Sequence, residues 1–370
     1  MDRAENELLT RVGPGTKMGD VLRRYWWPVW FTEQVERKPV PVRLLGEDFI
    51  LFRQPDGKLG MLERFCAHRR VSMEYGRVED GGIRCCYHGW KYDCSGQCVD
   101  QPMEPAGGKL KSEVTMKAYP VEEAGGLVFA YIGPQPTPVL PQFDLLYRDV
   151  GLTVCGADEE HCNWLQRAEN IVDQHHLGVL HASVYPQLAF KPMDVDWDET
   201  WYGMKITVRN QNRKPNVSHF VLPSSNRFPQ ARVNTTPSHN LRIRVPIDDT
   251  MTRTFWVTMY PDITDQGSLR TEGVTKTERG VYERVEDGWW DLPSHEQDRA
   301  AQESQGLITD RSIEFLGTTD MGIVMFRRIL RDSLRAVAEG RDPPGVLRDA
   351  NRGIIDLDTA MDEIGALTSA

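Results

Sequence analysis

The sequence predicts an α+β protein of two domains, a small all-β domain followed by a larger domain of strands and helices. Short apolar runs separated by turn residues succeed one another from about residue 40 to residue 133. A second β-rich region covers residues 195–285, and helical patterns follow it to residue 340. Because 370 residues exceed the usual span of one compact domain, we expect two domains.

The composition limits the classes of protein to which the chain can belong. Hydrophobic residues make up 40% and charged residues 26% of the chain, as in an ordinary globular protein. A formal net charge of −10 disfavours a nucleic-acid partner, because phosphate binding needs a basic face. The opening residues lack the apolar core of a secretory signal, and no apolar run reaches membrane-spanning length. We therefore expect a cytoplasmic protein without nucleic-acid or membrane partners.

Residues 1–38 are expected to form a helical segment that packs on the core. The pattern ENELLTRV is followed by a Gly-Pro-Gly break and then by MGDVLRRYWWPVWFTEQV, in which the helix should end or kink at Pro28. Five aromatic side chains between Tyr25 and Phe31 are too many for an exposed segment.

Residues 39–140 are expected to form the small all-β domain. Runs such as PVRLL, DFILFR and LVFAYIG are bounded by turn residues, as in strands joined by hairpins. The proline-rich stretch PQPTPVLP at residues 134–141 is a stiff candidate linker. The second domain is therefore placed at residues 141–370.

Two short arms in the small domain each contain one cysteine and one histidine. They are Cys66 with His68 and Cys85 with His88, and sixteen residues separate the arms. Such a set fits a tetrahedral zinc site, or a Rieske [2Fe–2S] centre in which two thiolates hold one iron and two imidazoles the other. Zinc fingers usually pair Cys with Cys and His with His, whereas each arm here carries one of each. The spacing favours the cluster over zinc and over unrelated core residues.

The remaining cysteines of this domain leave alternatives open. Cys86 could serve as a ligand in place of Cys85, although two residues between Cys85 and the following histidine suit one tight turn better. Cys94 and Cys98 flank a Ser-Gly turn and could bind a second metal, but packing in a hairpin is favoured. Seven cysteines in the whole chain do not suggest a disulfide framework.

The segment AENIVDQHHLGVLHASV at residues 168–184 is the second candidate for metal binding. Three of its residues recur at three-residue steps and would share one face of a helix: Asn170, Asp173 and His176. His181 lies five residues beyond His176, so both can reach one metal only if the helix distorts or ends between them. By spacing alone, His175 competes with His176.

The later part of the second domain supplies one further candidate site. In NLRIRV, Arg242 and Arg244 alternate with apolar residues and therefore project from one face of a strand. That face is either solvated or lines a pocket, in which guanidinium groups would bind a carboxylate. The segments SHEQDRAAQESQ and TTDMGIVMFRRILRDSLRAVAEG are expected to be helices, the second ending at Gly340.

Because it contains both metal segments, the chain resembles the α subunit of Rieske non-haem iron ring-hydroxylating oxygenases. Its local sequence motifs resemble those of the phthalate dioxygenase branch. The resemblance runs nearly end to end. It includes ERFCAHRRVSMEYG and IRCCYHGWKYD at the cluster, NIVDQHHLGVLH downstream and QDRAAQESQGLITDRSIEFLG near the end. Cys86 departs from the family, which commonly has another residue there, often proline, but this departure removes no ligand.

The resemblance implies two histidine ligands of a mononuclear iron. The family pattern Asp-x-x-His-x4-His falls on Asp173, His176 and His181, and so favours His176 over His175. In the family this aspartate bridges an iron histidine and a cluster histidine of the next subunit, which implies that Asp173 joins His176 to His88 of a neighbour.

A carboxylate far downstream is the third iron ligand in this family. The branch has a Gln-Asp pair followed by a glutamate and a Gly-x-Ile-x-Asp-Arg signature, which match Gln297, Asp298, Glu303 and GLITDR here. Asp298 is therefore the expected ligand, with Asp310 as its competitor.

The resemblance also implies the fold, partners and reaction. The catalytic domain would be an antiparallel sheet flanked by helices, of the helix-grip or START-like kind, and the subunits would form a homotrimer or stacked trimers. Electrons would pass from NAD(P)H through a separate flavin and iron–sulfur reductase or a ferredoxin, because no GxGxxG or P-loop motif is present in the chain.

We expect a dioxygenase or monooxygenase that uses O2 and mononuclear Fe(II) to oxidise an aryl carboxylate or related compound in aromatic catabolism. An O-demethylating or ether-cleaving monooxygenase is the alternative within the family. A Rieske electron-transfer protein without oxygenase activity is the alternative from another class.

Overall fold

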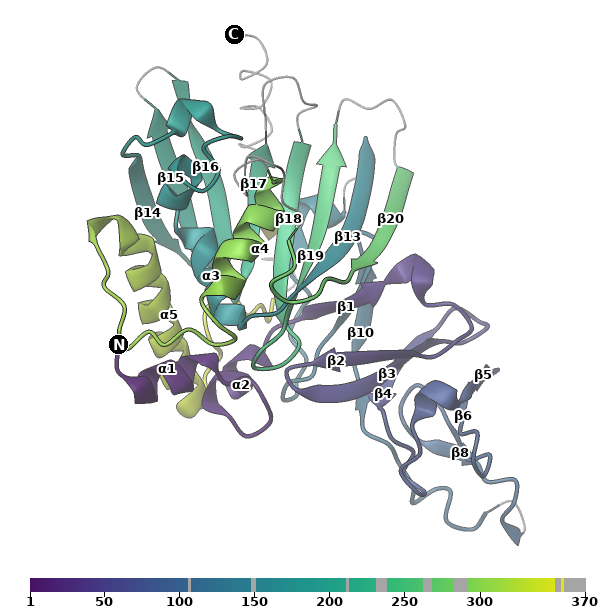
Figure 1. Ribbon diagram of the computed structural model, residues 1–370. Helices are drawn as coiled ribbons and strands as arrows, with labels where there is room; N and C mark the ends of the chain where they lie inside the picture. Colours follow the sequence, from purple (N-terminus) through teal and green to yellow (C-terminus); the bar gives the residue numbers. More distant parts are fainter. Residues whose placement is uncertain are drawn as a thin grey trace.

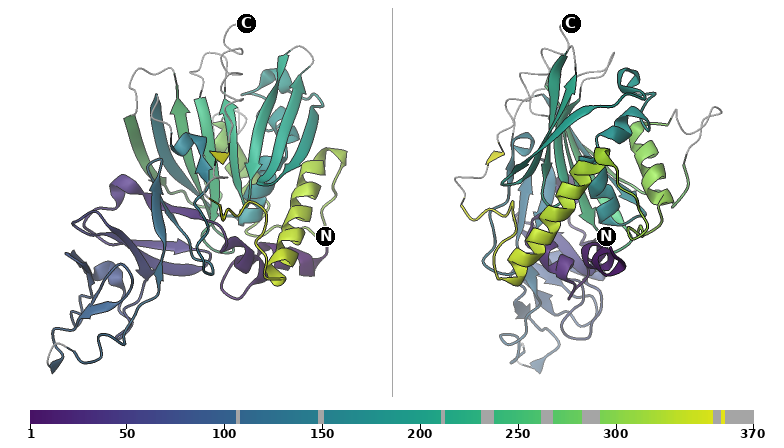
Figure 2. Two further views of the ribbon diagram at one scale, coloured as in Figure 1. Left: turned by 180° about the vertical axis from the view of Figure 1, so that it is seen from behind. Right: turned by 90° about the vertical axis from the view of Figure 1, so that its left-hand side faces the viewer.

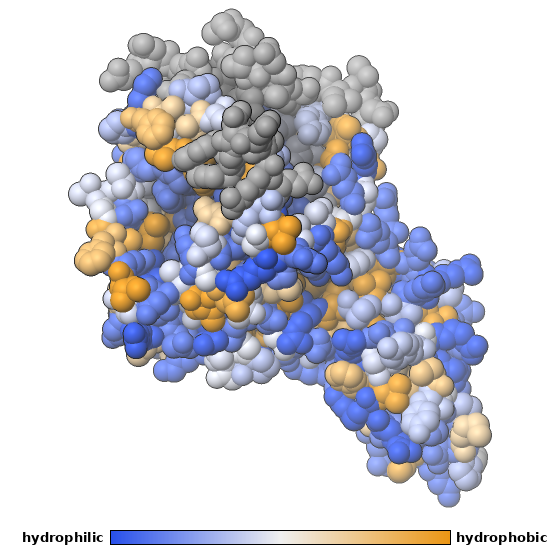
Figure 3. Space-filling model, in the orientation of Figure 1, coloured by the Kyte–Doolittle hydropathy of each residue, from blue (hydrophilic) through white to orange (hydrophobic). Residues whose placement is uncertain are grey.

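A computed structural model describes residues 1–105, 108–147, 151–210, 213–230, 238–261, 268–282 and 292–349, together with the backbone of residues 354 and 355. The chain forms a large lobe around a broad sheet and a small lobe that projects from it (Figure 1). The space-filling view shows the same projection at the lower right (Figure 3).

Two short helices open the chain, α1 (Arg3–Thr10) and α2 (Lys17–Leu22). The side chains of Asp2 and Thr16 cap them by accepting hydrogen bonds from the backbone N–H groups of Glu5 and Gly19.

The expected helix does not continue through the aromatic residues that follow, so this part of the prediction is wrong. Trp27–Phe31 is strand β1, which pairs antiparallel with β11 (Leu127–Ala130). Pro28 has no N–H to donate, which a helix interior does not tolerate but an edge strand does. Accordingly, β1 lies at the edge of the sheet β1-β11-β10, and its register shifts between Pro28 and Trp30.

Two four-stranded antiparallel sheets form most of the small lobe. The first has the order β2 (Val40–Leu44), β3 (Glu47–Arg53), β4 (Leu59–Glu63), β9 (Ala118–Tyr119). The second, at the far end of the lobe, has the order β5 (Arg77–Glu79), β6 (Gly82–Arg84), β7 (Lys91–Tyr92), β8 (Cys98–Asp100). The strand β10 (Val121–Ala124) then leads into β11. A core of its own joins the two sheets, with Ile50, Phe52 and Tyr92 fully buried.

An eight-stranded sheet forms the centre of the large lobe. Its strands, in spatial order, are β14 (Asp194–Thr200), β15 (Gly203–Asn210), β16 (Arg213–Val221), β17 (Ser225–Gln230), β18 (Ser238–Pro246), β19 (Thr252–Tyr260), β13 (Leu152–Glu160), β20 (Ser268–Thr275). All neighbours are antiparallel except β13 and β20. A short parallel pair, β12 (Gln142–Phe143) and β21 (Ile354–Ile355), lies apart from this sheet.

Helices α3 (Trp164–Val172), α4 (Ser294–Ser304) and α5 (Met321–Ala338) lie on one face of the sheet (Figures 1 and 2). The expected antiparallel sheet flanked by helices is thus confirmed. Phe326 of α5 packs edge-on against Phe220 of β16 at a ring-centroid distance of 4.8 Å. Within the described residues, no helix is long and apolar enough to cross a membrane.

The main core is continuous from the N-terminal helices to the eight-stranded sheet. Trp27 and Phe31 of β1 are fully buried in it, and the Phe31 ring lies 5.6 Å from that of Phe255 in β19. Alternate residues of β18, such as Leu241 and Ile243, belong to this core. Arg242 and Arg244 lie between them in sequence and therefore point to the opposite face, which α3 and α4 cover.

Candidate metal centres

The two Cys/His arms form two tight loops of similar construction in the small lobe. In the first, the backbone N–H of Arg70 donates to the carbonyl of Cys66 at 2.9 Å, and in the second, Gly89 donates to Cys85 at 3.2 Å. Arg70 and Gly89 both have positive φ, of 59° and 75°. Each loop therefore turns back on itself just after its cysteine.

The four candidate ligands meet where these loops face each other. The Cys66 and Cys85 side chains are buried. Burial raises the pKa of the Cys66 thiol, and the neighbouring Cys85 thiol adds to this increase. The rings of His68 and His88 are 4.7 Å apart and steeply inclined, at 67°. Two thiols on the inner side and two imidazoles on the outer side fit a [2Fe–2S] group held by one pair on each iron.

Aromatic side chains around these loops pack against two of the candidate ligands and limit their movement. Trp90 stacks on His68 at 4.3 Å with an angle of 5° between the rings. Tyr92 is fully buried, and its hydroxyl lies 3.3 Å from Cys66 Sγ. Hydrogen bonds to cluster sulfurs tune the reduction potential of such groups.

The other cysteines of the small lobe do not join these four. Cys86 is exposed, whereas Cys85 is buried. Cys94 Sγ lies 2.8 Å from the Gln54 amide nitrogen, and Cys98 is buried in the small core. Their positions match hairpin packing rather than a second metal site.

The helix that begins the second metal segment ends earlier than its sequence pattern indicates. α3 stops at Val172, and Asp173 already has extended backbone angles of −89° and 106°. A single 3-10 turn, His175–Gly178, follows it. The expectation that Asp173 and His176 share a helical face is therefore wrong, because the chain leaves the helix between them.

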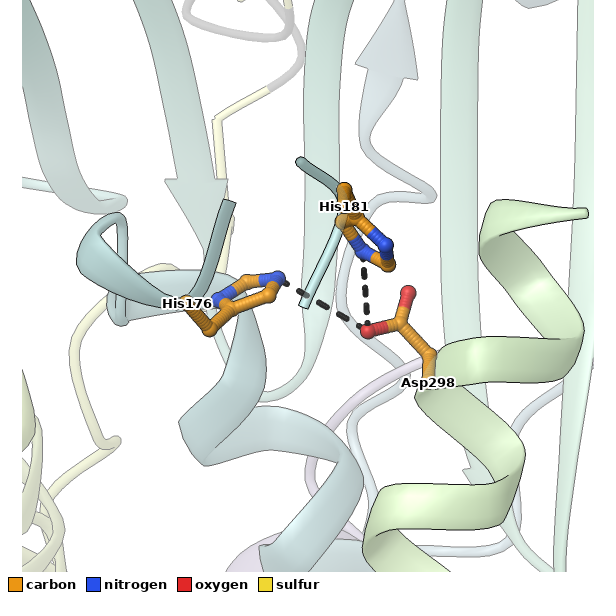
Figure 4. A group of neighbouring side chains, drawn as sticks. All are labelled: His176, His181 and Asp298. Carbon is orange, nitrogen blue, oxygen red and sulfur yellow. Dashed lines mark ion pairs between the residues drawn. The ribbon is translucent and has the colours of Figure 1, made fainter. Parts of the chain in front are cut away.

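This break brings three separated side chains together, as Figure 4 shows. His181 Nε2 lies 3.2 Å and His176 Nε2 3.7 Å from the same oxygen, Oδ1 of Asp298 in α4. One donor atom from each residue lies within 4.8 Å of the other two. Asp310 is not part of this group: its carboxylate is exposed, binds the N–H and hydroxyl of Ser312 and pairs with Arg3.

Hydrogen bonds on the far side of each imidazole fix which nitrogen faces the centre. His176 Nδ1–H donates to the carbonyl of Asp173 at 2.6 Å, and His181 Nδ1–H donates to Gln297 Oε1 at 2.6 Å. Both Nε2 atoms thus keep a lone pair for a metal. Burial raises the pKa of Asp298, but the imidazoles of His181 and His176 beside it, together with the charge of Arg167, hold that pKa well below the usual range.

Two neighbours complete the arrangement. Asn170 Nδ2 donates to Asp298 Oδ1 at 3.2 Å and lies 3.3 Å from His176 Nε2. The three-residue spacing singled out Asn170 without indicating this role. His175 points away from the centre, with Nε2 3.2 Å from the carbonyl of Met193, and the Asp173 carboxylate accepts the N–H groups of His175 and His176.

Arg242 and Arg244 line the buried face of β18, so the alternative of a solvated face is wrong. Arg244 is 4% exposed and donates to the side chain of Asn226. Within the described residues, the Nε atoms of both arginines have no hydrogen-bond partner. Burial lowers the pKa of both guanidinium groups, and the nearby carboxylates of Asp298 and Glu160 offset this lowering only in part. Among the described residues, no carboxylate forms an ion pair with either arginine. Arg242 also lies 5.9 Å from the ring of Phe228, and Trp256 is its partner on β19.

Comparison with known proteins identifies the family. Residues 25–120 match the Rieske [2Fe-2S] domain. The chain is 35% identical to the 5,5'-dehydrodivanillate O-demethylase oxygenase subunit of Sphingobium sp., over 93% of this chain and 83% of the relative. It is 32% identical to the phthalate 4,5-dioxygenase oxygenase subunit of Pseudomonas putida, over 92% and 88%.

A solved structure supports the fold. The oxygenase in an oxygenase–ferredoxin complex of carbazole 1,9a-dioxygenase is similar with a TM-score of 0.64 and 21% identity, over 95% of this chain and 98% of that one. The chain therefore belongs to the Rieske non-haem iron oxygenases, as an oxygenase α subunit of the phthalate dioxygenase-like branch, an enzyme whose cofactors are a Rieske [2Fe–2S] cluster and a mononuclear iron and whose co-substrate is O2.

Proposed function

We propose that this terminal oxygenase hydroxylates or dihydroxylates an aromatic compound that carries a carboxylate. The observation that supports this most directly is the meeting of His176, His181 and Asp298, whose donor atoms lie within 4.8 Å of one another. Two imidazoles and one carboxylate are the donor set of non-haem Fe(II) oxygenases. Iron held by these three residues would supply the chemistry of O2 activation, with electrons delivered through the Rieske cluster.

The protein would hold the two metal groups with ligands from two different lobes. Cys66, His68, Cys85 and His88 would hold the cluster. We assign these to a Rieske domain at residues 39–140 and the iron to a catalytic domain at residues 141–370, with residues 1–38 packed against the core. Nδ1 of His176 donates to the Asp173 carbonyl and Nδ1 of His181 donates to Gln297 Oε1, so the Nε2 atoms are the ones that face the proposed iron site.

A substrate carboxylate is proposed because Arg242, which is half-buried, and Arg244, which is buried, form no ion pair with a carboxylate among the described residues. Leaving a charge buried and unpaired is unfavourable, so a site that does this gains most when an anion enters. Arg242 and Arg244 would provide the positive charge, while Phe228 and Trp256 provide aromatic surface beside it. Arg227, by contrast, is already paired with Asp144 at 3.0 Å. Arg232, a further arginine near these residues in the sequence that could bind a carboxylate, lies outside the described residues.

Electrons are proposed to reach the iron from a neighbouring subunit of a homotrimer or a stack of trimers. Within one chain, the cluster loops lie in the projecting lobe, whereas α3 and α4 lie on the large lobe (Figure 1). Asp173 would join His176 to His88 of the neighbour, as the family pattern implies. A flavin and iron–sulfur reductase or a ferredoxin would reduce the cluster with electrons from NAD(P)H, a cytoplasmic donor.

An exposed apolar surface near Asp173 supports a subunit contact. Phe315 is 99% exposed, and other large apolar side chains next to it in sequence are exposed too: Ile313, Leu316, Met321 and Val324. Hydrophobic groups are visible at the left edge of Figure 3, where Figure 1 places the start of α5. Gly322, within this stretch, packs against the carbonyl of Val172, one residue before Asp173. Exposed patches of this kind mark interaction sites.

Two substitutions test the division into two metal sites. His88→Ala should abolish the Rieske EPR signal, whereas His176→Ala should keep that signal and lose only the mononuclear iron. If both substitutions abolished the cluster, the division would be wrong. Iron near three per chain supports an oxygenase, while two per chain with no substrate-dependent O2 uptake would favour the electron-carrier alternative.

O-demethylation or ether cleavage is the second candidate, favoured by the O-demethylase name of a relative with 35% identity. O2 uptake with a generic reductase, measured on benzoates, phthalates, aryl ethers and methoxybenzoates with product identification, separates the candidates. If the ether substrates were the only ones oxidised and released formaldehyde or a phenol, demethylation or ether cleavage would replace ring hydroxylation as the proposed function.

A further inference from the structure

Three consecutive carbonyl groups at the end of α3 each accept a hydrogen bond from a side chain. A helix leaves its last carbonyls without intrahelical partners, so these bonds replace the missing ones. The acceptors and donors are Ile171 with Gln174 Nε2 at 3.0 Å, Val172 with Trp197 Nε1 at 2.9 Å, and Asp173 with His176 Nδ1 at 2.6 Å. Only Trp197 comes from a distant element, the edge strand β14.

The hydrogen bond from Trp197 to Val172 lies so close to Gly322 that no residue with a side chain fits at position 322. A Cβ atom on Gly322 of α5 would lie 2.3 Å from the Val172 carbonyl oxygen and 2.4 Å from Trp197 Nε1. The backbone of α5 therefore closes over this bond. The contact is tight enough that a methyl group there must displace either the carbonyl or the indole.

The same side of β14 also holds the residue next to His176. The His175 ring lies 6.4 Å from that of Trp197, and its Nε2 bonds to the carbonyl of Met193, just before β14. The chain from Val172 to His176 is thus anchored to the sheet edge at two points. Between these points lies the Asp173 carbonyl that fixes the tautomer of His176.

We propose that Trp197, seated against Gly322, is a positioning residue for the mononuclear iron site. It ends α3 at Val172 and so holds the Asp173 carbonyl that turns Nε2 of His176 toward Asp298. This inference rests on the proposed role of His176 as an iron ligand. Loss of a hydrogen bond that a metal ligand makes on its outer side typically changes metal affinity by about 10- to 100-fold, and Trp197 acts on such a bond through the Asp173 carbonyl.

The test uses the full chain with its Rieske cluster intact and the mononuclear site emptied by a chelator. Fe(II) and, as a spectroscopic probe, Co(II) are titrated anaerobically into the parent, Trp197→Phe and Gly322→Ala. Trp197→Phe keeps an aromatic ring but removes the N–H. The matched control is Trp201→Phe, at the turn after β14, where the side chain is 49% exposed. The Rieske EPR signal reports the integrity of the rest of the protein.

We expect Trp197→Phe to weaken Fe(II) binding by about tenfold or more and to change the Co(II) absorption spectrum, with the Rieske signal unaltered. Gly322→Ala should act in the same direction and Trp201→Phe should have no effect. Parent-like binding and spectrum in Trp197→Phe would overturn the inference, as would equal losses in both tryptophan variants. A parent that binds no metal, or that binds it equally well after His181→Ala, would instead refute the proposed iron ligands.

Discussion

Two buried arginines on neighbouring strands should respond in opposite ways to replacement by methionine. Arg227 of β17 is 1% exposed and pairs with Asp144 on one face of the large sheet. Arg244 of β18 is 4% exposed on the other face, where Asn226 accepts one of its N–H groups and none of the described carboxylates forms an ion pair with it. The two sites differ in charge compensation much more than in burial.

The expected stability changes follow from that difference. Removing Arg227 breaks its buried ion pair with Asp144, which should lower the free energy of unfolding by about 3–5 kcal/mol. Removing Arg244 takes away a buried charge whose burial, together with repulsion from Arg167 and Arg242, is only partly offset by nearby carboxylates. Methionine retains most of the packing volume. Arg244→Met should therefore be neutral or stabilising, by up to about 4 kcal/mol, in the substrate-free protein.

Substrate binding should show the reverse pattern. A charge-assisted hydrogen bond to a carboxylate contributes about 1.5–3 kcal/mol, which corresponds to roughly 10- to 150-fold in kcat/KM. The assay compares the benzoate that gives the fastest O2 uptake with its benzamide analogue. Parent and Arg227→Met should prefer the benzoate, and Arg244→Met should lose most of that preference. Arg244 would not be the carboxylate-binding residue if Arg244→Met lowered the unfolding midpoint as Arg227→Met does, or if it kept the parent's preference for benzoate.

Two further predictions concern electron transfer and pH. Asp173→Asn keeps the oxygen that accepts the N–H groups of His175 and His176, so both metal groups should remain bound. Reoxidation of the cluster by O2 in the presence of substrate should nevertheless slow sharply. Unchanged single-turnover rates would remove Asp173 from the electron path. Burial lowers the pKa of His219, whose Nδ1 lies 2.6 Å from the Tyr202 hydroxyl, to about 4. The free energy of unfolding should therefore fall by up to about 3 kcal/mol as pH drops from 6.5 toward 4, because the unfolded chain binds the proton first. Denaturant titrations at several pH values should show this dependence in the parent but not in His219→Gln. If the free energy of unfolding fell equally with pH in both proteins, another group would be responsible for the dependence.

The loops around the cluster could be predicted from sequence because their geometry is local. Cys66 and His68, or Cys85 and His88, are joined by one turn, and residues within that turn supply the bonds that close it. The strands of the small lobe could be predicted for a similar reason, since each is bounded by its own turn residues. In contrast, Pro28 excludes a helix interior but does not show whether a turn or an edge strand takes its place.

The iron site could not be placed by spacing because its shape depends on distant residues. Nothing between residues 168 and 184 shows that α3 ends at Val172, since the donor that caps this carbonyl is Trp197 and the residue that closes over it is Gly322. Asp298 is 117 residues from His181, so local spacing could not single it out among the acidic residues. Alternation in β18 showed that Arg242 and Arg244 share a face, but which face is covered depends on the packing of α3 and α4.

The end of α3 also explains how one aspartate can serve two purposes. Asp173 Oδ1 accepts two backbone N–H groups and starts the 3-10 turn, and its carbonyl orients His176. Its other carboxylate oxygen, Oδ2, lies 3.7 Å from His176 Nδ1, and the side chain is 27% exposed. That oxygen can accept a hydrogen bond from outside the chain without loosening the turn. Contact with a neighbouring imidazole would then leave the position of His176 unchanged, as a path for electrons between two rigidly held metal groups requires.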